Sequence, residues 1–268
     1  MNNKFTQKIR LSVIIPCFNK ADAIALQLEA LALQQWSEPW EVIVVNNGST
    51  DNIVAVVEQY KNRLPNLQIV DAASGGASYA RNVGIAAASS DAFVFCDADD
   101  KVFSGWLAAV GEALGKYDFV SGPLESQLNG SGRSRQEDKQ KEAIGLNQLP
   151  PSFMPWGNGC NFGITRLVVD TIGRFDESMY FAEDIEFGWR AQRADFKIHF
   201  IRNATGRDRL SHELLTNYRQ VRNWAKSGLD VRNGYGLVRG EYIKLSLFSG
   251  SCKSLLFLLL KIPTKNEQ

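Results

Sequence analysis

The stretch Phe93-Val94-Phe95-Cys96-Asp97-Ala98-Asp99-Asp100 is the one around which the chain is organised. A short apolar run followed by acids predicts a buried strand that delivers carboxylates at its carboxyl end. Because neighbouring carboxylates repel one another, a fold that holds them together normally supplies a cation or uses them in chemistry. The alternative is a solvated acidic turn that caps a helix. The stretch alone leaves both interpretations open, and the rest of the chain decides between them.

Alternating strands and helices on either side of this stretch predict an α/β fold. Apolar, β-branched runs predict strands at 11–17, 41–45, 67–70, 92–96, 118–121, 161–164 and 197–201. Helical spacing of apolar residues falls between them, for example at Ile24, Leu28 and Leu31. This spacing favours a mainly parallel sheet flanked by helices on both faces, with a helical C-terminal tail.

Composition bounds the class of protein. With 268 residues, 44% hydrophobic and 22% charged, the chain is long enough for a substantial core. A net charge of +1 gives no reason to expect nucleic acid as a partner. The four cysteines are far apart and form no CxxC pair, so we expect reduced thiols in a cytoplasmic protein, not a zinc site or disulfides. We also expect no signal peptide and no transmembrane helix.

Two segments depart from the alternating pattern. Residues 124–151 are polar and predict a mobile loop, with an ordered insertion as the alternative. The tail from Tyr242 to Ile262 is very apolar, and its run Leu255–Leu260 lies between Lys253 and Lys261. This run is too short to span a bilayer. Residues 252–262 either lie at a membrane surface or dock on the protein's own core or on a partner subunit.

Polar residues cluster where ligands bind in open α/β sheets, outside the carboxyl ends of the strands. Pro16 closes the first strand, Asn46–Asp51 follows the second, and Asp97–Asp100 follows the fourth. The turn at 16–20 has no glycine, which disfavours a dinucleotide site of the GxGxxG type, and no P-loop sequence is present. We therefore expect a nucleotide held in some other way.

Six signatures in a fixed order resemble those of the family 2 inverting glycosyltransferases. They span about residues 11–200 and are Val13–Lys20, Asn46–Asp51, Ala80–Gly84, Asp97–Asp100, Gly173–Glu177 and Glu183–Asp184. The resemblance implies a fold of the nucleotide-diphospho-sugar transferase type. It also implies a catalytic domain at 1–205 and a helical C-terminal extension at 206–268, packed on that domain or on the membrane surface.

The resemblance implies a donor-binding site made of Pro16, Asn47, Arg81, Asn82, Asp97 and Asp99. Asn47 matches the residue that hydrogen-bonds the base, and an amide offers the donor and acceptor that suit uracil, so a UDP-sugar is favoured. Arg81 and Asn82 match the segment that flanks the ribose and diphosphate. Asp51 is expected to cap the next helix, with ligand contact as the alternative.

The metal and the chemistry are implied in the same way. Asp97 and Asp99 match the DxD motif, and oxygen ligands suit Mn²⁺ or Mg²⁺, which would neutralise the departing diphosphate. Asp99 is the first ligand expected, with Asp100 as an alternate. Asp184 matches the catalytic base, which takes the proton of the acceptor hydroxyl. The implied sugar and acceptor pocket contains Trp156, Asn158 and Glu183.

One departure from the family concerns histidine. Gly206 stands where many relatives place a His that can complete the metal site. His199 is interpreted as a packed strand residue. His212 is either a surface residue at a helix start or a substitute ligand, so the sequence leaves the strength of the metal site open.

We expect an inverting glycosyltransferase that moves a sugar from a nucleoside-diphosphate sugar to a hydroxyl of a glycan or lipid-linked acceptor. Cell-surface polysaccharide or glycolipid synthesis is the expected setting, in the cytoplasm or on the inner membrane face. The alternative is a non-catalytic nucleotide-sugar-binding or scaffold protein on the same fold. A sugar nucleotidyltransferase is disfavoured, because a Gly-rich, basic loop after the first strand is missing.

Overall fold

A computed structural model of the chain describes most of the N-terminal three quarters. The described residues are 9–73, 75–126, 145–147 and 154–208, with short pieces at 222–223, 226–228, 231 and 234–235.

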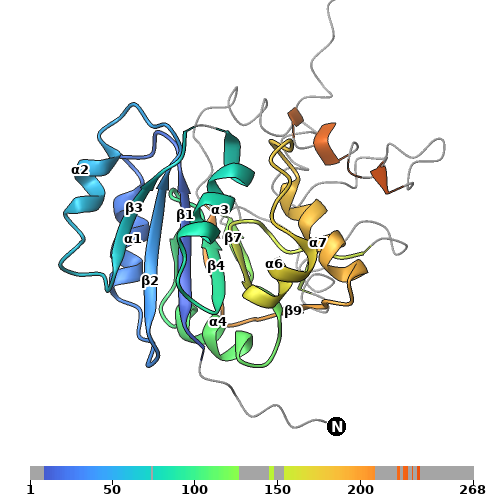
Figure 1. The fold of residues 1–268 in the computed structure, drawn as a ribbon. Coiled ribbons are helices and arrows are strands. Elements are labelled where there is room, and N and C mark those ends of the chain that lie inside the picture. The colour runs from blue at the N-terminus through green and yellow to red at the C-terminus, as the bar shows by residue number, and fades with distance from the viewer. Residues whose placement is uncertain are drawn as a thin grey trace, which may run out of the picture.

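A seven-stranded sheet forms the centre of the molecule (Figure 1). Its spatial order is β3 (Leu67–Asp71), β2 (Trp40–Asn46), β1 (Leu11–Cys17), β4 (Ala92–Cys96), β8 (Asn161–Thr165), β6 (Phe119–Ser121) and β9 (Ile198–Phe200). The first four strands are parallel, whereas β8 runs antiparallel to both of its neighbours, β4 and β6. The predicted α/β fold with a mainly parallel sheet is confirmed.

Helices cover both faces of this sheet, as the continuous apolar strands require. One face packs against α1 (Ile24–Ala32), α2 (Ile53–Glu58) and α4 (Trp106–Leu114). The other packs against α3 (Gly76–Ala87), α6 (Arg166–Ile172) and α7 (Glu183–Arg193). Side chains of β1 alternate between the two layers: Val13 and Ile15 enter the first core and Ile14 the second.

A second, three-stranded sheet lies beside the acidic turn that follows β4. It consists of β5 (Lys101–Val102), β10 (Gly206–Asp208) and β7 (Leu124–Ser126), with β10 in the middle. Gly206 pairs with Val102 on one side and Leu124 on the other. The segment predicted as a loop from residue 124 therefore begins with a strand. The boundary predicted at 205/206 falls directly before β10, which pairs with β5 and β7.

Several expectations fall outside the described residues. They are the remainder of the predicted loop, most of the helix near Leu214–Ala225, His212, and the apolar tail with residues 252–262. Within the part of the chain that the structure describes, no helix has the length and apolarity needed to cross a membrane.

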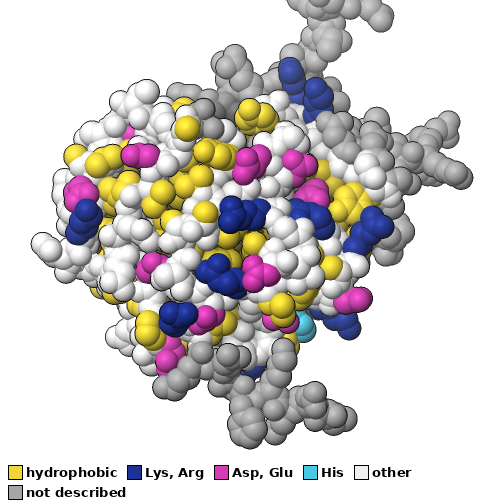
Figure 2. Space-filling model, in the orientation of Figure 1, with side chains coloured by type: hydrophobic (Ala, Val, Ile, Leu, Met, Phe, Trp, Pro, Cys, Tyr) yellow, Lys and Arg dark blue, Asp and Glu magenta, His cyan; other side chains and the backbone are white. Residues whose placement is uncertain are grey.

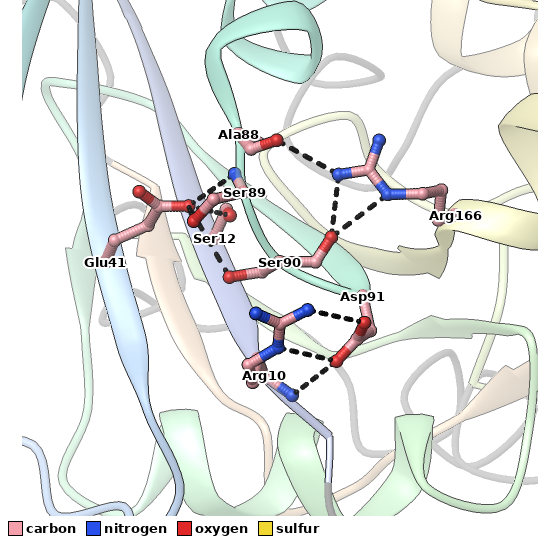
Figure 3. Close-up of polar contacts among 8 residues, drawn as sticks. All are labelled: Arg10, Ser12, Glu41, Ala88, Ser89, Ser90, Asp91 and Arg166. Atoms are coloured by element: carbon pink, nitrogen blue, oxygen red, sulfur yellow. Dashed lines mark hydrogen bonds and ion pairs between the residues drawn. The ribbon is translucent and has the colours of Figure 1, made fainter.

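A polar network ties together the amino ends of the central strands (Figure 3). The carboxylate of Glu41, only 8% exposed, accepts hydrogen bonds from Ser12 Oγ at 2.6 Å, from Ser89 N at 2.8 Å and from Ser89 Oγ at 3.0 Å. Burial raises the pKa of Glu41, but these hydrogen bonds outweigh it and hold the pKa below its usual value. This carboxylate is fully used in joining β1, β2 and the turn before β4.

Two arginines complete this edge. Arg10 forms a bidentate ion pair with Asp91, with both Nε–Oδ2 and Nη2–Oδ1 at 3.0 Å. Arg166 donates to the carbonyl oxygens of Ser90 at 2.7 Å and Ala88 at 3.0 Å, and it lies over the ring of Phe93.

On the face of the molecule in Figure 2, basic and acidic side chains are interspersed.

Candidate active site

The loops that follow β1 and β2 are joined at the carboxyl end of the sheet. Asn47 N donates to the carbonyl of Cys17 at 2.8 Å, and Thr50 N donates to Oδ1 of Asn19 at 2.8 Å. Asp51 accepts from Ala21 N at 2.8 Å and from Ile53 N, the first residue of α2, at 3.3 Å. Asp51 therefore links the two loops and accepts from the first residue of α2, while the N-cap position itself is held by Asn52.

Asn47 presents an unused acceptor next to a glycine turn. Its Nδ2 donates to the carbonyl of Gly76 at 3.2 Å, while its buried Oδ1 has no hydrogen-bond partner among the described residues. Gly75 and Gly76 have φ angles of 150° and 78°, which other residues rarely adopt. A Cβ at Gly76 would lie 3.1 Å from the ring of Tyr180, so the turn passes close to that ring because it carries no side chain. This edge can receive a donor group from a ligand.

The three acids after β4 point to different partners. Asp99 Oδ2 lies 2.6 Å from Lys20 Nζ, so this carboxylate is used in an ion pair with the loop after β1. Asp97 and the buried Asp100 instead gather with Cys160, and one donor atom from each lies within 4.8 Å of the others. The gathered set thus contains Asp100, which was expected only as an alternate ligand, and Cys160, which sequence reasoning missed. Asp99, the first ligand expected, is not in it.

Strand direction explains why Cys160 reaches the acids. In the antiparallel pair β4–β8, Cys96 lies opposite Asn161. The residue before Asn161 therefore lies beside the residue after Cys96, which is Asp97. The alternating pattern of apolar runs gives no strand direction, so the sequence carried no signal for this pairing.

Arg81 connects the acidic turn to the start of α7. Its guanidinium is buried, 3% exposed, and Nη1 donates to Glu183 Oε1 at 2.5 Å. Nη2 donates to the carbonyl of Gly159 at 3.3 Å and lies 3.7 Å from Asp97 Oδ1. Burial lowers the pKa of Arg81, but the charges of Glu183 and Asp97 raise it by more, so the net shift is upward. This guanidinium is therefore a fixed positive charge between the acidic turn and the Glu183-Asp184 pair.

Asn82, the next residue, is held by hydrogen bonds to the segment that precedes α7. Its Nδ2 donates to the carbonyl of Phe175 at 2.9 Å and to Glu177 Oε1 at 2.8 Å, and its Oδ1 accepts from Phe175 N at 3.0 Å. The amide is therefore used in holding the Gly173–Glu177 segment against α3. These contacts make Asn82 a positioning residue.

Asp184 lies in the first turn of α7, directly after Glu183. Oδ1 accepts from Ile185 N at 2.9 Å, and Oδ2 accepts from Gly159 N at 2.9 Å. Burial, reinforced by the charge of Glu183, raises the pKa of Asp184 to about 6, although the hydrogen bond from Gly159 and the charge of Arg81 oppose the shift. A carboxylate with this pKa is mostly ionised at neutral pH and is a stronger base than an ordinary Asp.

The loop 156–160 separates the acidic turn from Asp184. Gly159 fits between them because a Cβ there would lie 3.1 Å both from Arg81 Nη2 and from the Cβ of Asp184. Asn158 Oδ1 accepts from Asn147 Nδ2 at 2.5 Å, and Trp156 is partly buried near Trp189. The two residues of the predicted sugar pocket in this loop thus precede Gly159, whose N–H donates to Asp184.

Asn161 and the histidine expectations can also be placed. Asn161 is buried, and its side chain bonds to Trp106 Nε1 and to the carbonyls of Pro123 and Ala204, so its amide is used within the fold. His199 in β9 stacks on Tyr117 at 3.7 Å, and burial lowers its pKa, as expected of a packed strand residue. Glu186 pairs with Arg190 at 2.8 Å.

A mainly parallel sheet with acids after β4, a buried arginine and a paired Glu-Asp at a helix start describes a nucleotide-sugar transferase fold. The sequence model of the family described as Glycosyl transferase family 2 matches residues 12–172, and the chain belongs to this family. The family resemblance read from the six signatures is thereby confirmed.

Two curated relatives illustrate the similarity. Uncharacterized glycosyltransferase YibD of Escherichia coli is 42% identical over 94 residues, which cover 35% of this chain and 27% of that protein. Poly(ribitol-phosphate) beta-N-acetylglucosaminyltransferase TarS of Staphylococcus aureus is 36% identical over 97 residues, which cover 35% of this chain and 17% of TarS. The matched segment thus spans less than a third of either relative.

Solved structures share the fold over more of the chain. TarS residues 1–349 in complex with UDP align with a TM-score of 0.57 and 22% identity, over 82% of this chain and 66% of that one. The mannosyltransferase PcManGT of Pyrobaculum calidifontis, in complex with GDP-Man and Mn²⁺, gives a TM-score of 0.64 at 17% identity, over 97% and 77%. At this low identity the likeness establishes the fold alone.

Proposed function

We propose that this protein is a metal-dependent inverting glycosyltransferase that moves a sugar from a nucleoside-diphosphate sugar to an acceptor hydroxyl. The observation that carries the proposal is the position of Asp184. It is a partly buried carboxylate with a pKa of about 6, joined through the backbone of Gly159 to a loop whose other side meets Asp97 and Asp100. A base and a site for a departing diphosphate thus lie on two sides of one short loop.

The donor is assigned to the carboxyl edge of β1, β2 and β4. The unused Oδ1 of Asn47 can accept a hydrogen bond from the N3–H of uracil, which favours a UDP-sugar. Pro16 closes β1 at the same edge, and Lys20 and Arg81 supply positive charge for a diphosphate. The complexes of TarS with UDP and of PcManGT with GDP-Man support a nucleotide ligand on this fold.

The donor atoms of Asp97 and Asp100 suit a divalent cation. Two carboxylates from one turn offer the hard oxygen ligands that Mn²⁺ and Mg²⁺ prefer. Asp99, which is paired with Lys20, would instead orient that lysine toward the donor. When bound, the metal would neutralise negative charge on the departing nucleoside diphosphate.

The protein's own residues then account for proton transfer. Asp184 accepts the proton of the acceptor hydroxyl, and Glu183, paired with Arg81, keeps a negative charge beside it that strengthens Asp184 as a base. Inversion follows if the acceptor attacks from the side of Asp184 while the diphosphate leaves toward Asp97 and Asp100. Trp156 and Asn158 are assigned to the sugar and acceptor pocket.

The proposal extends to the biological setting. TarS is named for transfer to poly(ribitol-phosphate), which supports cell-surface polysaccharide synthesis with a glycan or lipid-linked acceptor. The predicted contact of residues 252–262 with the inner membrane face would bring such an acceptor to the site.

A panel of nucleotide sugars tests the proposal. A donor at about 100 times its Kd should stabilise the protein by roughly 2.7 kcal/mol in the presence of Mn²⁺, read as a thermal shift. Transfer is then measured as release of nucleoside diphosphate with an acceptor, and the anomeric configuration of the product is read by NMR. Binding without transfer to any acceptor would favour the scaffold alternative, and a retained configuration would contradict inversion.

A further inference from the structure

We propose that Cys160 is a third ligand of the metal site, so that this protein holds its cation through two carboxylates and one thiolate. The inference rests on the proposed function, because it concerns the cation assigned there to Asp97 and Asp100. Nothing in the spacing of the four cysteines suggested such a role, and the sequence alone pointed away from it.

The geometry of the three donors is close to that of a coordination site. Cys160 Sγ and one oxygen each of Asp97 and Asp100 lie within 4.8 Å of one another. Donor atoms around a tetrahedral ion are about 3.4 to 3.7 Å apart, from metal–ligand bonds of roughly 2.0 to 2.3 Å. In the proposed site the three donors move closer together when the ion binds. Cys160 is partly buried, in contrast to the fully buried Cys17 and Cys96.

The backbone holds Cys160 beside the acids from both sides. On one side, Gly159 N donates to Asp184 and its carbonyl accepts from Arg81. On the other, Asn161 is fixed by its register opposite Cys96 and by its three side-chain hydrogen bonds. A ligand held between two anchored residues loses little entropy when it binds an ion.

A thiolate changes which metals the site prefers. Carboxylates alone suit Mg²⁺ and Mn²⁺, whereas a sulfur ligand favours softer ions such as Zn²⁺, Co²⁺ and Cd²⁺ over Mg²⁺. Coordination requires the thiolate, so the thiol proton is released to solvent as the metal–sulfur bond forms. We therefore expect this protein to bind Co²⁺ more tightly than Mg²⁺.

The test is a Co²⁺ titration of the full chain, with no donor or acceptor present. A cobalt–thiolate bond gives a charge-transfer absorption in the near ultraviolet that carboxylates do not give. We expect this band in the unmodified protein and in the matched control Cys252→Ser, and its loss in Cys160→Ser. Co²⁺ affinity in Cys160→Ser should fall by about tenfold or more, because loss of even an outer-shell partner typically costs that much.

Further variants keep the result interpretable. Cys160→Asp should restore Co²⁺ binding without the band, and it should shift the preference back toward Mg²⁺. Asp100→Asn should weaken binding, whereas Asp99→Asn, at the acid paired with Lys20, should not. Circular dichroism and the melting temperature check that each variant is folded. A band that survives Cys160→Ser, or no band in the unmodified protein, overturns the inference. Because no sugar nucleotide is used, failure of the proposed transferase activity would leave this result unaffected.

Discussion

Two carboxylates near opposite ends of one sheet show how the surroundings of an acidic side chain set its pKa and its role. Glu41, at the amino ends of the strands, is surrounded by hydroxyl and amide donors that lower its pKa. Asp184, at the site near their carboxyl ends, receives two backbone hydrogen bonds but lies beside Glu183, and burial raises its pKa to about 6. The first carboxylate is fully compensated and stabilises the fold. For the second, hydrogen bonds and the charge of Arg81 do not offset burial and the charge of Glu183, so its pKa stays raised and it is available for chemistry.

The same contrast holds for the arginines at the two ends. Arg10 pairs with Asp91 in water, with about half of each side chain exposed. Arg81 is buried between Glu183 and Asp97, and its Nε has no hydrogen-bond partner among the described residues. The Arg10–Asp91 pair is solvated, whereas the Arg81–Glu183 pair is removed from water. The following predictions test this difference.

Replacing Asp184 should have the largest effect, which is on kcat. Asp184→Asn cannot accept the hydroxyl proton, so kcat should fall on the order of 10² to 10⁴-fold while donor binding is kept. The measurement is steady-state release of nucleoside diphosphate, with donor affinity taken from thermal shifts.

The matched control for that variant is Glu41→Gln, which changes a carboxylate to an amide at the other end of the sheet. Its activity per folded molecule should stay within a few-fold of the unmodified protein. Equal losses of kcat in the two variants would show that the different environments of Glu41 and Asp184 do not decide which of them takes part in catalysis.

Removing the buried cation should have the next largest effect. Arg81→Met leaves Glu183 buried without its partner, and breaking such a pair typically costs 3 to 5 kcal/mol of stability. It should also weaken donor binding, since the charge beside Asp97 is lost. Urea unfolding gives the free energy. A loss no larger than that of an exposed ion pair would mean that Arg81 is not the electrostatic link between the two motifs.

The sequence predicted the order of the strands and helices and the position of Asp184 at a helix start, but not which partners the three acids after β4 would contact. Apolar runs and helical spacing fixed the strands and helices because they reflect burial, which is local in sequence. The directions of Asp97, Asp99 and Asp100 depend on the turn after β4 and on Lys20, which lies far away in the chain. Cys160 depends on the antiparallel direction of β8, which no pattern in residues 161–165 reveals.

The pH dependence of stability should have opposite signs at the two ends. The lowered pKa of Glu41 means that its contribution is present above the unfolded value of about 4.3 and is lost as pH falls. The raised pKa of Asp184 means that its contribution is present below about 3.9 and is lost as pH rises through about 6.

These signs can be measured with the two amide variants in metal-free buffer. Glu41→Gln should cost about 1 to 3 kcal/mol at neutral pH, and less in acid. Asp184→Asn should gain stability relative to the unmodified protein between about pH 4 and pH 7, by up to about 3 kcal/mol. Urea unfolding across this pH range gives, for each variant, the slope against pH of its difference in free energy of unfolding from the unmodified protein. Slopes of the same sign would contradict the assignment of the two environments.

The smallest effect should come from the exposed ion pair. Arg10 meets Asp91 through two hydrogen bonds of 3.0 Å, but water competes for both groups and salt screens them. We therefore expect Arg10→Gln to shift the urea midpoint barely beyond experimental error, and the shift to disappear in about 1 M salt. A loss as large as that of Arg81→Met would mean that charge, and not the hydroxyl bonds around Glu41, holds the amino ends of the strands together. The two ends of the sheet would then rely on ion pairs of similar strength. The strength of an ion pair alone could not then identify the end that carries the proposed active site.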